Sequence, residues 1–293
     1  MPCLEASSYI GERLDNRRTM DQNIDERALT EDLVDFLDSS SLKSVWGRVA
    51  TKLNDQGLYL NTTVRKSTNE NIIGADIGLI IERSVYSSRA RYAALIQCKK
   101  VDNDGVVKGF YHAPPKRVLR GGEGQISLNR ESLDSQSSLM LDITPSSFYF
   151  IFTPPSLVEV LTNTEPAAFA VSSEGCRSRV WNMGHFDYDS PHSLPVLSSI
   201  QRAAAIGILV VPALAVEAQR STRYRVSLRE ILPNCVPFWY WFGELLVPGF
   251  VGDRSSYTID VASNITGPSG PGRVNPTGRY GVRYSISVGV GSG

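Results

Sequence analysis

The chain has 293 residues, of which 42% are hydrophobic and 20% are charged. This composition can bury a substantial core and excludes a protein that is disordered over most of its length. Thirty Lys and Arg residues balance 30 Asp and Glu residues, so net charge alone does not favour a nucleic acid, a membrane surface or an acidic substrate as the partner. The four cysteines form no CxxC pair, which argues against a zinc ribbon or a dithiol redox site and fits a reducing cytoplasm.

The N-terminal part reads as a polar segment followed by two helices. Residues 1–23 contain no apolar run of signal-peptide length, so we expect a cytoplasmic protein. A helix is predicted over 24–38, where Asn23 and Glu26 have the spacing of a capping box. Its apolar residues recur at helical spacing: Leu29, Leu33, Phe36 and Leu37. A second helix is predicted over 42–57, with a glycine at its end.

Three strands are predicted next, and the second and third form a hairpin. Residues 58–67 (LYLNTTVRKS) alternate well enough for the first strand. Residues 72–100 (IIGADIGLIIERSVYSSRARYAALIQCKK) read as two apolar strands joined by a polar loop. Residues 101–122 are rich in Gly, Pro and basic groups and are expected to form a loop. A helix over 124–143 and an aromatic strand from 146 to a double proline follow.

The C-terminal half is predicted to extend the same sheet. A helix over 193–207 leads into a buried strand over 208–216, which would join the sheet through a crossover. The most apolar stretch, 235–252 (CVPFWYWFGELLVPGFVG), contains Glu244 and is shorter than the ~20 residues of a membrane span. We expect a buried helix and turn there, with FWYWF packed in the core. Residues 265–281 are Gly-rich, Pro-rich and polar, as in a loop or mobile tail.

The predicted hairpin carries three groups that a core strand pair does not need. In YAALIQCKK, the alternation of a strand places Gln97 and Lys99 on one face. Asp76 begins the neighbouring strand, so its carboxylate can converge with these two side chains at one edge of the sheet. Hard divalent cations such as Mg²⁺ bind one or two protein carboxylates and complete their coordination with other oxygens. A lysine beside them can stabilise the charge that develops on a phosphate under attack.

The order GAD, then about twenty residues of strand and loop, then IQCKK, resembles the PD-(D/E)XK superfamily of restriction-endonuclease-like nucleases. It is most similar to the Mrr-like branch, in which Gln replaces the acid of the (D/E)XK element. The resemblance implies an α/β fold with a restriction-endonuclease-like core, a mixed central β-sheet flanked by helices, and a C-terminal extension. The implied division is a polar segment over 1–23, a nuclease core over 24–155, and a C-terminal region over 156–293 with a Gly/Pro-rich tail.

The same resemblance assigns roles to particular residues. It implies catalytic residues Asp76, Gln97, Lys99 and Glu26, with Asp76, Gln97 and Glu26 as ligands of Mg²⁺ or Mn²⁺. Ala75 stands where the family name has proline, and Gln97 brings no charge to the metal. Glu26 shares a helical angle with the apolar stripe of its helix, whereas Glu31 points away, so Glu26 is preferred and Glu31 is the competing candidate.

Basic residues gather around the hairpin and the loop after it. Residues 83–130 contain ten Lys or Arg and three acidic residues, although such a run is often only a solvated face. Beside a nuclease site, it predicts a surface that contacts the phosphates of DNA. The expected nucleic-acid contacts are Lys100, Lys116, Arg117, Arg120 and Gln125, although Gln125 also reads as an ordinary surface residue.

The function predicted first is a metal-dependent DNA endonuclease of prokaryotic restriction or antiviral defence. A partner protein could supply target recognition or activation, because no separate DNA-recognition module is evident. A homo-oligomer is compatible with this function, and no membrane partner is expected. The alternatives are a catalytically inactive nuclease-fold subunit that binds nucleic acid or serves assembly, and a structural protein whose hairpin only looks like the motif. A metal site in GHFDYDSPH (184–192) is a weaker possibility.

Overall fold

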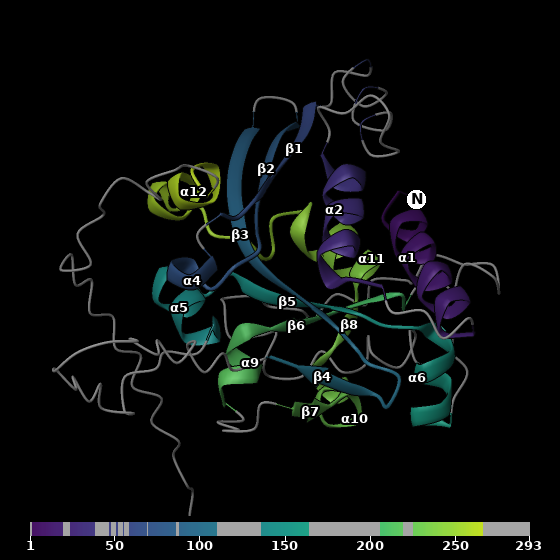
Figure 1. Cartoon of the computed structure of the whole chain (residues 1–293). Coiled ribbons are helices and arrows are strands. Elements are labelled where there is room, and N and C mark those ends of the chain that lie inside the picture. The colour runs from purple at the N-terminus through teal and green to yellow at the C-terminus, as the bar shows by residue number, and fades with distance from the viewer. Residues whose placement is uncertain are drawn as a thin grey trace, which may run out of the picture.

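The computed structural model describes residues 2–19, 24–38, 47, 51, 55, 59–68, 70–85, 88–109, 136–163, 206–218 and 225–265. These residues form a six-stranded sheet with helices on both faces (Figure 1). The strands of this sheet are β1 (Tyr59–Lys66), β2 (Ile77–Val85), β3 (Ser88–Lys100), β5 (Ser147–Phe152), β6 (Ile208–Pro212) and β8 (Val236–Pro237). A separate two-stranded sheet pairs β4 (Val106–Lys108) with β7 (Arg225–Ser227).

The helical elements are short apart from the two at the N-terminus. They are α1 (Pro2–Thr19), α2 (Glu26–Leu37), α4 (Glu70–Ile73), α5 (Gln136–Ile143), α6 (Pro155–Thr162), α9 (Ala213–Ala218), α10 (Leu228–Ile231), η2 (Leu232–Asn234), α11 (Phe238–Tyr240), η3 (Trp241–Leu246) and α12 (Ser256–Ser263). Within the described residues, no helix has the length and apolar character needed to cross a lipid bilayer.

The large sheet is mixed. Its strand order is β1-β2-β3-β5-β6-β8, and only the β3–β5 pair is parallel. The β2–β3 hairpin is antiparallel with Ile77 opposite Ile96, and β1 pairs with the outer side of β2. The prediction of three adjacent strands within residues 58–100 is therefore confirmed, and so is the aromatic strand that became β5.

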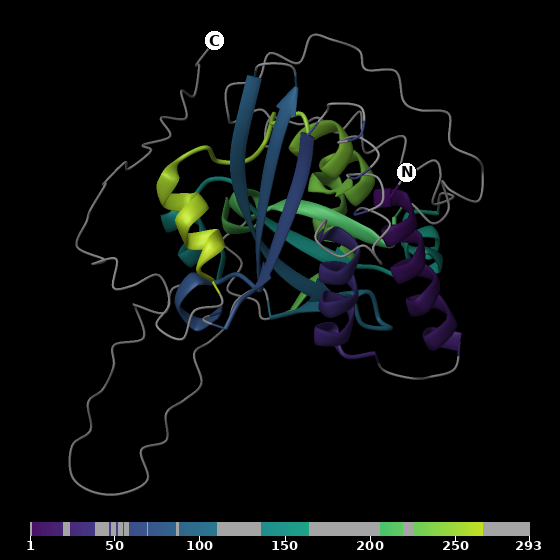
Figure 2. The ribbon, with the colours of Figure 1, turned by 90° about the horizontal axis from the view of Figure 1, so that it is seen from above.

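Strand alternation divides the core into two layers on either side of the sheet. Tyr92, Ala94, Ile96 and Cys98 of β3 pack with apolar residues of α1, α2, α11 and η3. The alternate residues of β3 face a second layer with side chains from α4, α5, α9 and α12. Figure 2 shows α1 and α2 on one side of the sheet and α12 on the other. By this alternation Gln97 and Lys99 belong to the same face of β3 as the second layer. This face of the sheet is hereafter the α5 face.

Helix α2 forms as its apolar stripe predicts. Leu29, Leu33 and Leu37 are buried against the sheet. The predicted cap is corrected: the side chain of Asp25 accepts a hydrogen bond from the backbone N–H of Arg27, so Asp25 is the N-cap. Asn23 lies outside the described residues.

Several elements differ from the sequence-based expectation. The polar N-terminal segment forms α1, whose Ile10 and Leu14 are buried, and α12 precedes the predicted tail. The strand predicted over 208–216 ends at Pro212, where α9 begins, and β6 is antiparallel to β5. Strand β4 lies in the expected loop over 101–122. The predicted helices over 42–57 and 193–207, the first part of the helix over 124–143, and the tail lie almost wholly outside the described residues.

The aromatic stretch after β8 is buried, as predicted. All five side chains of FWYWF are at most 2% exposed: Phe238, Trp239, Tyr240, Trp241 and Phe242. Trp241 packs edge-on against Phe148 and Phe150 of β5, with ring centroids 5.0 and 5.1 Å apart. Such ring pairs stabilise a core beyond the area that they bury. This segment therefore holds one face of the sheet and is not available to stack on bases.

Candidate active site

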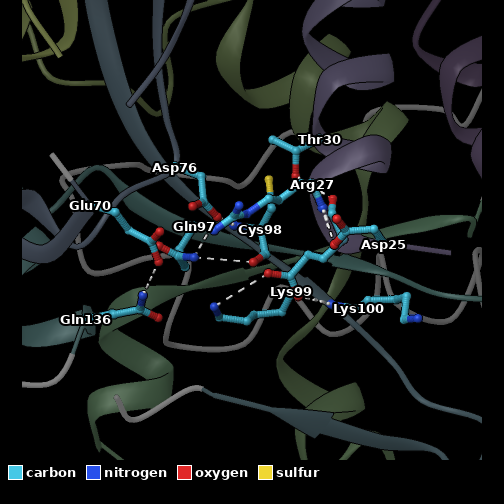
Figure 3. Close-up of polar contacts among 11 residues, drawn as sticks. Asp25, Arg27, Thr30, Glu70, Asp76, Gln97, Cys98, Lys99, Lys100 and Gln136 are labelled. Carbon is cyan, nitrogen blue, oxygen red and sulfur yellow. Dashed lines mark hydrogen bonds and ion pairs between the residues drawn. The ribbon is translucent and has the colours of Figure 1, made fainter. Parts of the chain in front are cut away.

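The hairpin register brings Asp76 to the end of β3. The backbone N–H of Asp76 donates to the carbonyl of Ile96 at 2.9 Å, and its carbonyl accepts from Ser67 at 2.6 Å. The Asp76 carboxylate is fixed by two donors at Oδ2, the side-chain Nε2 of Gln97 at 2.6 Å and the backbone N–H of Cys98 at 2.8 Å (Figure 3). The predicted convergence of Asp76 with the QCK segment is present in the structure.

Gln97 is fully buried, yet its amide is only half satisfied. Its Nε2 donates to Asp76 and, more weakly, to the carbonyl of Cys98 at 3.3 Å. Its Oε1 has no hydrogen-bond partner among the described residues. A buried acceptor without a donor costs about 1–3 kcal/mol. An oxygen left in this state beside a carboxylate is a ready ligand for a cation.

Lys99 and Glu26 lie next to this pair. Lys99 is 4% exposed, and its Nζ lies 3.8 Å from Oε1 of Glu26. The other carboxylate oxygen of Glu26 accepts the backbone N–H of Lys100 at 2.9 Å. Glu31 instead forms an exposed ion pair with Lys66. Of the two glutamates considered from the sequence, Glu26 is the one at the site.

Two residues that were not expected from the sequence also reach the site. Gln136, the first residue of α5, is 3% exposed, and its Nε2 donates to Oε1 of Glu70 at 2.6 Å (Figure 3). The Oε1 of Gln136 has no partner among the described residues, which repeats the state of Gln97. A hint lay in the sequence ENIIGAD, where an acid begins a short helix and the glycine that ends it lies two residues before Asp76.

A close backbone contact holds this second pair in place. Gly74 has a φ of +77°, and a Cβ at this position would lie 2.4 Å from the carbonyl oxygen of Gln136. Only glycine combines that backbone conformation with that approach. The loop that carries Asp76 is therefore packed directly on the start of α5.

The electrostatics of the site reflect several carboxylates in a confined place. Burial, followed by the negative charge of Glu70, raises the pKa of Asp76 to about 7, and Lys99 opposes this rise. Burial also raises the pKa of Glu26, against the lowering effect of Lys99 and of the Lys100 N–H. Burial in addition raises the pKa of the Cys98 thiol, so that thiol stays protonated and unreactive. A bound cation would offset the repulsion between Asp76 and Glu70.

The donor set suits a hard cation rather than a soft one. Among the described residues, no three His, Cys, Asp or Glu side chains are arranged as a complete metal-ligand group. The oxygens present are the carboxylate of Asp76, a neighbouring glutamate, and the unpartnered amide oxygens of Gln97 and Gln136. Mg²⁺ and Mn²⁺ accept such oxygens and keep several waters, so the residues fit one of these ions.

Of the remaining residues predicted to contact nucleic acid, Lys100 is the one that the structure describes. The Nζ of Lys100 donates to the carbonyl of Ile24, just before α2, at 2.7 Å. Lys116, Arg117, Arg120 and Gln125 all lie outside the described residues, and so does the 184–192 segment considered as a second metal site.

Comparison of the chain with protein-family models, with curated proteins and with solved structures found no match.

Proposed function

We propose that this protein is a metal-dependent endonuclease that hydrolyses phosphodiester bonds of DNA, of the PD-(D/E)XK type with Gln in place of the second acid. The observation that carries the proposal is the meeting of Asp76, Gln97 and Lys99 at one end of the hairpin. The Gln97 amide contacts the Asp76 carboxylate at 2.6 Å, and Lys99 lies beside Glu26. The sequence motif by itself predicts this arrangement. A hairpin that resembles the motif only by chance is therefore a poor explanation.

The residues divide into a cation site and a charged group for the substrate. Asp76 and the Oε1 of Gln97 would hold the cation, together with a second carboxylate from Glu26 or Glu70. When bound, Mg²⁺ or Mn²⁺ would lower the pKa of a coordinated water and neutralise charge on the phosphate. Lys99 presents its ammonium at the same end of β3, where Glu26 restrains it. This ammonium would orient the attacking water or stabilise the negative charge that grows on the phosphate.

Prokaryotic restriction or antiviral defence remains the proposed context, with a partner protein supplying target recognition or activation. These proposals rest on the family resemblance of the motif. The basic residues proposed to contact DNA phosphates are Lys116, Arg117 and Arg120, which lie in the sequence between β4 and α5 and outside the described residues.

One observation favours the alternative of a catalytically inactive nucleic-acid-binding subunit. Oδ2 of Asp76 is already occupied by two donors, one of them the Gln97 amide that replaces an acid. A neutral amide holds a divalent cation less strongly than a carboxylate, because it adds no charge to the field at the ion. The two functions differ in cleavage, whereas both include binding of nucleic acid.

The test is incubation of the purified protein with Mg²⁺ or Mn²⁺ and plasmid, linear or single-stranded DNA. The variant Lys99→Ala is expected to lose cleavage by about 10²-fold or more, as for loss of one preorganised electrostatic group. Arg91→Ala is the matched control on β3, because Arg91 is 51% exposed at its side chain and pairs with Glu82 toward the other end of the hairpin. Equal cleavage by wild type and Lys99→Ala would exclude the hairpin as the source of activity. DNA binding without cleavage would favour the inactive subunit.

A further inference from the structure

Two carboxylates compete to be the second acid at the cation site, and they approach from opposite faces of the sheet. Glu26 begins α2, which packs on the α1 and α2 side. Glu70 begins α4, and Gln136 begins α5; both helices place apolar side chains in the core layer on the α5 face. Gln97 and Lys99 have the parity of that same face. The face that carries the motif side chains is therefore also the face of Glu70.

The carboxylate of Glu26 is already committed to the end of β3. One oxygen accepts the Lys100 N–H at 2.9 Å, and the other lies 3.8 Å from the Lys99 ammonium. A divalent cation placed on Glu26 would therefore lie close to a buried positive charge. Like charges so close together repel each other, and the repulsion is stronger in a buried site than in water. The contacts of Glu26 instead suit a residue that restrains Lys99.

Glu70 and Asp76 share a different and repeated arrangement. Each accepts one hydrogen bond of 2.6 Å from the amide nitrogen of a buried glutamine, Gln136 and Gln97 respectively. In each glutamine the oxygen of the same planar amide is buried and unpartnered within the described part of the chain. Two carboxylates are thus accompanied by two neutral oxygens without donors. This is the set of hard ligands that a divalent cation takes, with water completing its coordination.

Backbone contacts join the segments that carry the two glutamines and the two carboxylates. The tight approach of Gly74 to Gln136 fixes the loop between Glu70 and Asp76 against α5.

We propose that Glu70, and not Glu26, is the second carboxylate of the cation site, with Gln97 and Gln136 supplying neutral oxygens, and that Glu26 is a positioning residue for Lys99. The ligand class is a hard divalent cation, Mg²⁺ or Mn²⁺. The inference rests on the proposed function for the presence of such a cation, and it reassigns the ligand that the family resemblance takes from the leading helix.

Calorimetric titration of the full chain with Mn²⁺ alone, without DNA, tests the inference. Glu70→Gln is expected to weaken Mn²⁺ binding by about 10-fold or more, whereas Glu26→Gln should remain within about 3-fold of wild type. Glu31→Gln is the matched control on α2, since Glu31 lies on the surface and pairs with Lys66. Because Glu70→Gln could disturb the fold, Gln136→Met provides a second variant that keeps side-chain volume and removes the proposed ligand oxygen. It should also weaken Mn²⁺ binding.

Cleavage measurements separate this inference from the proposed function. With saturating Mn²⁺, Glu26→Gln should lower kcat and shift its pH profile, because Lys99 loses its nearby carboxylate, while the affinity for Mn²⁺ stays near that of wild type. Absence of cleavage by every protein, with the expected pattern of Mn²⁺ affinities, would refute the proposed function and leave the cation site standing. Wild-type affinity in Glu70→Gln and Gln136→Met, equal losses in Glu26→Gln and Glu70→Gln, or no Mn²⁺ binding by wild type would each overturn the inference.

Discussion

Removing the charge of Asp76 should stabilise the folded protein at neutral and alkaline pH when no divalent cation is bound. The Asp76 carboxylate is largely buried beside Glu70, so its charged form is unfavourable in the folded state. Asp76→Asn keeps the shape of the side chain. Its oxygen can still accept the Cys98 N–H, and a turned Gln97 amide can accept from the new NH₂ group. The substitution thus removes the repulsion and keeps most of the hydrogen bonds.

The pH dependence and its size follow from the raised pKa. The pKa of Asp76 rises from 3.8 to about 7 in the folded state. The folded protein therefore binds more protons than the unfolded chain between these values, and its free energy of unfolding falls as pH rises through this window. A difference of about 3 in pKa corresponds to about 4 kcal/mol. Asp76 is partly exposed, so solvent screening reduces this upper limit, and we expect a gain of about 1–2 kcal/mol at pH 8.

Urea denaturation in the presence of a chelator, at pH 5 and at pH 8, measures the effect. Asp76→Asn should exceed wild type in stability at pH 8, and the gain should shrink markedly at pH 5. Asp35→Asn is the control, because Asp35 is exposed on α2 and away from the site. Mn²⁺ should stabilise wild type at pH 8 and leave Asp76→Asn almost unchanged. A variant that is less stable than wild type by the same amount at both pH values would refute the reasoning.

Three further predictions concern the same region. Gln97→Glu should bind Mn²⁺ more tightly than wild type and retain cleavage, because it adds a charged ligand; weaker binding by calorimetry would show that Gln97 is not a ligand. Gly74→Ala should lower the free energy of unfolding by about 2–4 kcal/mol, because alanine meets both the positive φ and the carbonyl of Gln136. Gly243→Ala, which has open space around its Cβ, should change stability far less in the same urea series. Removal of three basic side chains between β4 and α5, by Lys116→Ala, Arg117→Ala and Arg120→Ala, should weaken DNA binding. It should also lower the slope of log affinity against log salt by about one for each phosphate that is no longer neutralised, and an unchanged slope would exclude these residues from the interface.

Local patterns in the sequence determined the part of the site that lies on neighbouring strands. Strand alternation placed Gln97 and Lys99 on one face of the sheet. The two strands pair as an antiparallel hairpin, so Asp76, just before the start of β2, lies beside the end of β3. The helical angle of Glu26 relative to its apolar stripe likewise brought it to this end, although its contacts turned out to be with Lys99 and Lys100. These features depend on periodicity and on pairing between adjacent elements, which a sequence displays directly.

The tertiary structure alone decided the rest of the site. Glu70 and Gln136 are 66 positions apart and meet only because α4 packs on α5 across the end of the sheet. Helices α1 and α12 carry weak apolar patterns, and their places on the two faces depend on the strands that they cover. The raised pKa of Asp76 and the unpartnered oxygens of Gln97 and Gln136 arise because distant segments exclude water from them. Burial and charge coupling are sums over neighbours in space, so no spacing along the chain encodes them.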